Sequence, residues 1–92
     1  MDYGKLDAPL ASAVEEAARA PESRSLVVIL RLTGAPSDRE VARLREAGVE
    51  ASSSAATVVT GVLSRRDVDE LSEEPFVMSL SLSGRRRPMV GG

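Results

Sequence analysis

A stretch near the end of the chain reads Phe76-Val77-Met78-Ser79-Leu80-Ser81-Leu82-Ser83. Its residues alternate between larger apolar and smaller or polar side chains, a period of two that is typical of a strand with one face in a core. We therefore predict a strand with these core-facing side chains: Phe76, Met78, Leu80 and Leu82. Three arginines, a proline and a terminal pair of glycines follow within 84–92, and this composition predicts an exposed tail.

Three earlier stretches also predict strands. Leu26 to Thr33 is apolar on both faces, which favours a central position in a sheet. Val58 to Leu63 is rich in β-branched residues and contains Gly61, where a bulky side chain would obstruct a packed neighbour. Val49 to Ala55 is small and rich in serine, so it fits a short edge strand.

The segment from Asp7 to Ala20 predicts an amphipathic helix. Asp7 is a suitable N-cap residue and Pro9 suits a first turn. The apolar face is narrow and rich in alanine, so we expect an arm that packs on the domain or on a neighbouring molecule. Pro21 ends this helix, and the residues after it form a linker.

Two further helices have recognisable starts. Ser37, with Glu40 three residues later, is the pattern of a capping box, and Gly48 is a typical residue just beyond a helix end. Ser64 and Asp67 repeat the pattern at the start of the second of these helices.

The order after the N-terminal arm is thus strand, helix, strand, strand, helix, strand. Right-handed crossovers then predict an α+β, ferredoxin-like βαββαβ fold, an antiparallel sheet with both helices on one face and the first and third strands in the middle. We expect an N-terminal helical arm and linker over 1–24, the domain over 25–83 and the tail over 84–92. The predicted core includes these residues: Leu30, Leu44, Leu63, Leu71 and Leu80.

The composition excludes several classes of function. The 92 residues contain no Cys and no His, so nucleophilic catalysis by a Ser/His/Asp or Cys/His set is excluded, and we expect neither an enzyme nor a metal or other cofactor. A net charge of −2 with 2% aromatic residues does not favour a nucleic-acid partner. Because no apolar run approaches ~18 residues and no leader pattern is present, we expect a soluble, cytoplasmic protein without a membrane partner.

The segments follow one another in a characteristic order: Val27-Val28-Ile29-Leu30-Arg31-Leu32, Ser37 to Gly48, Val58 to Leu63, Asp67 to Leu71, and Phe76 to Leu80. Their order and spacing resemble the propeptide domain of subtilisin-like serine proteases and the related stand-alone propeptide-like inhibitors. The flanks Lys5-Leu6-Asp7 and Arg85-Arg86-Arg87-Pro88-Met89 look like segments that bracket such domains. The resemblance covers nearly the whole chain.

This resemblance implies a ferredoxin-like fold whose uncovered sheet face packs on two surface helices of a protease, with the C-terminal tail in the active-site cleft like a bound product. The implied docking residues are Val27, Ile29, Val58, Thr60, Val62 and Val77. The implied cleft residues are Arg85, Arg86, Arg87, Pro88 and Met89, with Met89 near the scissile-bond position.

Two departures from the family pattern affect this expectation. Ser81 and Ser83 stand where family members often carry acidic residues that cap the protease helices. A serine still accepts a backbone hydrogen bond but loses a charge–dipole contribution of roughly 0.3 to 1 kcal/mol per site. No protease domain follows Gly92 in this sequence, so we expect action in trans, as an inhibitor or a folding helper.

Two alternatives remain open at this stage. The apolar sheet face is also compatible with a non-inhibitory protein-interaction or self-assembly module, and therefore with a homo-oligomer. The Gly91-Gly92 terminus resembles the end of ubiquitin-like carriers. Those proteins begin with a β-hairpin, whereas this chain begins with a predicted helix.

Overall fold

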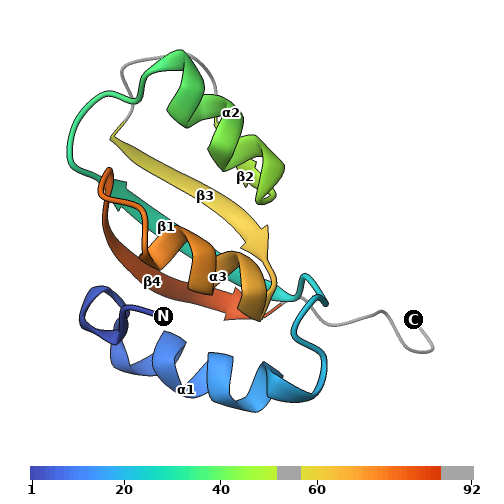
Figure 1. Cartoon of the computed structure of the whole chain (residues 1–92). Helices are drawn as coiled ribbons and strands as arrows, with labels where there is room; N and C mark the ends of the chain where they lie inside the picture. The colour runs from blue at the N-terminus through green and yellow to red at the C-terminus, as the bar shows by residue number, and fades with distance from the viewer. Residues whose placement is uncertain (52–56, 86–92) are drawn as a thin grey trace.

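The structure, a computed structural model, describes residues 1–51 and 57–85. Within these ranges it is a small α+β domain with a four-stranded antiparallel sheet and three α-helices (Figure 1). The elements in chain order are the 3₁₀ helix η1 (Tyr3–Lys5), α1 (Ala8–Glu16), the 3₁₀ helix η2 (Ala17–Arg19), β1 (Leu26–Leu32), α2 (Asp38–Glu46), β2 (Val49–Glu50), β3 (Val58–Leu63), α3 (Arg65–Ser72) and β4 (Val77–Arg85).

The strand order across the sheet is β2-β3-β1-β4, and all three neighbouring pairs are antiparallel. The prediction that the first and third strands are central is therefore confirmed. β2 is a two-residue edge strand, Val49–Glu50, so the edge position predicted for the stretch from Val49 to Ala55 is confirmed. Ala51 is not part of the strand, and residues 52–55 of the predicted strand lie outside the described residues.

One face of the sheet carries the core. Along β1 the even-numbered side chains are buried, whereas Val27 and Ile29 are half-buried and Arg31 is exposed. All five predicted core leucines are fully buried, which confirms that prediction. Side chains of α1, α2 and α3 join the same core cluster, so the helices pack on this one face (Figure 1).

Both predicted capping boxes are present. The Ser37 Oγ accepts a hydrogen bond from the Glu40 backbone N–H at 3.2 Å, and the Glu40 carboxylate accepts one from the Ser37 N–H at 2.9 Å. The corresponding two distances between Ser64 and Asp67 are both 3.0 Å. Gly48, just beyond α2, has a φ of 90°, which glycine adopts without strain.

The N-terminal segment packs along the outer edge of β4. Leu6 forms a parallel bridge with Leu80, and the Asp7 N–H donates to the Leu80 carbonyl at 3.1 Å. One oxygen of the Asp7 carboxylate caps α1 by accepting from the Leu10 N–H at 2.9 Å and also accepts from the Leu82 N–H at 3.3 Å. Because α1 buries Leu10, Ala13 and Val14 in the core, the arm packs on its own domain.

The predicted linker before β1 also makes specific contacts. The Arg24 guanidinium donates to the Asp67 carboxylate at 3.0 Å and to the Glu46 carbonyl at 2.9 Å. It therefore connects the last residue of α2 to the first turn of α3.

Gly61 in β3 lies against the backbone of β2. A Cβ built on it would come within 2.7 Å of the Val49 Cα and 2.8 Å of the Gly48 carbonyl oxygen. A side chain at this position therefore requires the two strands to move apart, which confirms the role predicted for this glycine.

We expect Gly61→Ala to lower the free energy of unfolding by about 1 to 3 kcal/mol, because the added methyl group meets backbone atoms. Gly34→Ala is the matched control, since a Cβ there has no heavy atom within 4 Å. Urea denaturation of the two variants measures the difference. A Gly61→Ala midpoint equal to that of the control would contradict the close approach.

The pairing of β4 with β1 corrects the predicted alternation of this strand. Ser79 lies opposite Arg31 and Val77 lies opposite Leu32, so Met78 is an extra residue at a register shift. Val77 is consequently 1% exposed and Met78 53% exposed. The predictions that Met78 faces the core and that Val77 belongs to a docking face were wrong, because a bulge changes which side chains face the core.

The end of β4 corrects the predicted start of the tail. Gly84 lies opposite Val27 and Arg85 opposite Leu26, so both residues continue the strand. A second register shift falls at Ser83, between these pairs and the Val28–Leu82 pair.

Candidate docking surface

The candidate site is the sheet face turned away from the helices, called here the open face. Directly opposed residues of antiparallel strands point to the same face, so the pairing assigns its members. They are Val27, Ile29, Arg31, Glu50, Val58, Thr60, Val62, Ser79 and Ser81.

Four apolar side chains form the centre of the open face, and we call them the apolar patch: Val27, Ile29, Val58 and Val62. Val58 is 54% exposed and the other three are half-buried. They lie on the two central strands, with Val27 opposite Val62 and Ile29 opposite the exposed Thr60. Within residues 1–51 and 57–85, the helices pack on the other face of the sheet. Five of the six predicted docking residues thus share one surface, and Val77 does not.

Along β4 the open face is formed by small side chains. Ser81 is half-buried and lies opposite Ile29, and Ser79 lies opposite Arg31. Ser83 is exposed at the register shift. The two serines predicted to contact helix ends are therefore accessible in different degrees, and Ser81 adjoins the apolar patch.

Of the predicted cleft residues, Arg85 is the last residue of β4. The other four lie outside the described residues: Arg86, Arg87, Pro88 and Met89. Of the tail predicted over 84–92, the described chain therefore includes only Gly84 and Arg85, both within β4.

Two charged residues of the open face were not predicted as site residues. Arg31 lies on β1 opposite Val58, and Glu50 lies on β2 opposite Thr60. Arg31 shares the period-two alternation of Val27 and Ile29, so that alternation was sufficient to place it on this face. Glu50 required the register of β2, which its short sequence does not indicate.

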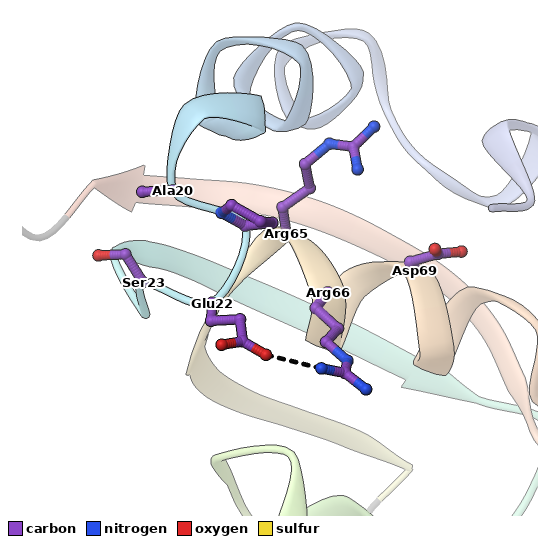
Figure 2. A pocket seen from close by; sticks show the side chains of 7 residues that line it. Ala20, Glu22, Ser23, Arg65, Arg66 and Asp69 are labelled. Carbon is purple, nitrogen blue, oxygen red and sulfur yellow. Dashed lines mark hydrogen bonds and ion pairs between the residues drawn. The ribbon is translucent and has the colours of Figure 1, made fainter.

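A separate hollow of about 460 Å³ lies between the chain after η2 and the start of α3. Figure 2 shows the residues that line it, and Arg65 and Arg66 point to opposite sides. The Arg65 guanidinium donates to the Val14 carbonyl at 3.0 Å. Arg66 forms an ion pair with Glu22 at 2.6 Å (Figure 2).

These contacts argue against an anion site in the hollow. The hydrogen bond that Arg66 donates to the Glu22 carboxylate, together with the negative charge of that group, raises the pKa of Arg66 above its ordinary value. Because the two guanidinium groups diverge and both already have partners, they do not converge on a common ligand.

Neither a metal centre nor a membrane span is found in the described part of the chain. No three acidic side chains in residues 1–51 and 57–85 are grouped so that they would hold a metal ion. None of the helices in those ranges combines the length and the apolar character needed to cross a membrane.

Comparison with known proteins gives no match: no protein-family model, no curated protein and no solved structure is similar to this chain. A functional proposal therefore depends on the residues of the chain and on the geometry of the open face.

Proposed function

We propose that the chain is a propeptide-like domain with a ferredoxin-like fold that binds a subtilisin-like serine protease in trans, as an inhibitor or folding helper. It has no catalytic role of its own in this proposal. The open face docks on the protease surface and the C-terminal tail enters the active-site cleft.

The observation that carries this proposal is the apolar patch on a sheet face opposite the helices. Val58 leaves more than half of its surface in water. Ile29 lies diagonally across from Val58, and Val27 and Val62 pair with each other on the far side of Ile29. A contiguous apolar surface of this kind is typical of a protein-interaction site. The strand order β4-β1-β3-β2 agrees with a ferredoxin-like arrangement, and this supports the fold part of the proposal.

The open face alone is expected to make a weak complex. Full burial of four such side chains contributes at most about 6 to 12 kcal/mol, and three of them are already half-buried. Association costs on the order of 4 to 15 kcal/mol. Tight inhibition therefore requires a second contribution, which we assign to the tail.

In this mechanism the tail binds like a product. Its backbone pairs with the edge of the cleft as an added strand, and side chains near Met89 fill the specificity pockets. Since β4 continues through Arg85, the tail begins directly at the end of the sheet. If the expected cytoplasmic location holds, the protease is an intracellular one.

A Gly-Gly-ended ubiquitin-like carrier is less well supported. The described chain begins with η1 and α1, and β1 pairs with β3 and β4. The initial β-hairpin of such carriers is therefore absent from residues 1–51.

The test is an inhibition titration against subtilisin-like proteases, beginning with any encoded beside the gene for this chain. A variant that ends at Arg85 keeps β4 complete and removes the other four predicted cleft residues, Arg86, Arg87, Pro88 and Met89. We expect it to inhibit about 10²- to 10⁴-fold less well than the full chain while still docking weakly, because two linked contacts reinforce each other.

The control for that titration is a chain that lacks only Gly91 and Gly92 and should inhibit like the full chain. Equal potency of the full chain and the variant ending at Arg85 would exclude the tail mechanism. The absence of binding by either would exclude the protease as partner.

A further inference from the structure

Two opposite charges flank the apolar patch on different strands. Arg31 is exposed on β1, beside Val58 on one side and Ser79 on the other. Glu50 is exposed on β2, at the sheet edge beside Thr60. Neither residue forms an ion pair with another residue in 1–51 or 57–85. The open face therefore presents one positive and one negative group around an apolar centre.

The arrangement is compatible with a second copy of the same face. In a two-fold symmetric interface, residue i of one copy contacts residue j of the other and the reverse contact also forms. A two-fold axis that runs parallel to the sheet, in the interface above the apolar patch and oblique to the strands, exchanges the Arg31 and Glu50 margins. Both charges then meet an opposite charge while the two apolar patches cover each other.

The shape and total charge of the molecule also permit this contact. Ser79 and Ser81 on β4 are small, so they leave room beside the bulkier residues of β1 and β3 for the second copy. The net charge of the chain is only −2, so repulsion between two copies is small.

We infer that the open face binds a second copy of this chain in a two-fold dimer with Arg31 of each copy opposite Glu50 of the other. The dimer is weak, with a Kd on the order of 0.1 to 1 mM, because only four apolar side chains per copy are covered. If the proposed function holds, the dimer also acts as a reservoir that withholds the open face from the protease. That role rests on the proposed function, whereas the existence of the dimer does not depend on it.

The test measures the dimer Kd by sedimentation from about 10 µM to 1 mM, the range expected to span dissociation. Arg31→Glu alone and Glu50→Arg alone should each raise the Kd about tenfold or more, since each puts like charges together twice. An equimolar mixture of the two variants should associate again, because every reversed charge then meets an opposite one.

Arg39→Glu is the matched control for Arg31→Glu. It produces the same change in net charge on α2, which lies on the other side of the sheet. Its Kd should equal that of the unmodified chain. A circular-dichroism melt of every variant verifies that the fold is retained.

Three outcomes would overturn the inference. They are an unmodified chain that remains monomeric throughout the range, a dimer whose Kd the charge reversals leave unchanged, and single variants whose mixture does not associate. The protease titration gives a separate answer. A dimer without protease binding removes only the proposed function, and protease binding by a strict monomer removes only the dimer.

Discussion

Leu80→Ala is expected to lower the free energy of unfolding by about 2 to 5 kcal/mol, because it leaves a cavity in a close-packed core. Leu80 is fully buried in β4 and lies opposite Leu30. Its carbonyl also accepts the hydrogen bond from Asp7 that holds the N-terminal segment. Since small domains are stable by only about 5 to 15 kcal/mol in total, the variant should lose a large share of its stability.

Met78→Ala is the control for this prediction. It lies two residues earlier in the same strand and is 53% exposed, so its effect should remain within about 0.5 kcal/mol. Chemical denaturation gives both values. A loss for Leu80→Ala no larger than that for Met78→Ala would show that the register of β4 has been misassigned.

Ile29→Arg should leave the domain folded and remove binding at the open face. Ile29 lies at the centre of this face, between Thr60 on β3 and Ser81 on β4. In the free protein the arginine stem can lie along the sheet with its charge in water. In a complex the charge is covered without a partner and the apolar contact is lost, which costs roughly 1.5 to 3 kcal/mol or more, a 10- to 150-fold weaker complex.

Ala42→Arg provides the control, because Ala42 is exposed on α2, on the opposite side of the sheet. Protease binding and self-association are measured for both variants, together with their thermal melts. Unchanged binding by Ile29→Arg, or an equal loss for Ala42→Arg, would contradict the assignment of the open face.

Local sequence patterns predicted the elements whose causes are local. The Ser37 and Ser64 capping boxes are each built from residues three positions apart, so the sequence contains both partners. The apolar alternation of Leu26 to Leu32 was sufficient to predict a central strand with Val27 and Ile29 on the face away from the core.

The errors arose where distant segments determine the structure. A period-two pattern from Phe76 onward places Met78 inside, but the shift against β1 at Leu32 puts Val77 there instead. The contacts that Arg24 makes from the linker were not predicted, because its partners Glu46 and Asp67 are distant in sequence.

For the candidate site too, residues on regular strands were predicted and residues whose position depends on distant pairing were not. Its apolar residues were named from the resemblance to protease propeptides, and those of β1 and β3 share one face because these two strands alternate regularly. Glu50 was not predicted, because its position depends on the pairing of two residues of β2 with β3. The likeness to protease propeptides suggested a use for the face, and only binding experiments test that use.

The most direct test of the docking proposal is a methyl-resolved NMR titration of the full chain with a subtilisin-like protease whose catalytic serine is blocked. We expect the methyl signals of the apolar patch to shift or broaden. The buried methyl groups of Val41, Leu44 and Val68, which belong to the helices on the other side, should remain unchanged. Perturbation confined to those helices, with Val27, Ile29, Val58 and Val62 unaffected, would contradict the proposed use of the open face.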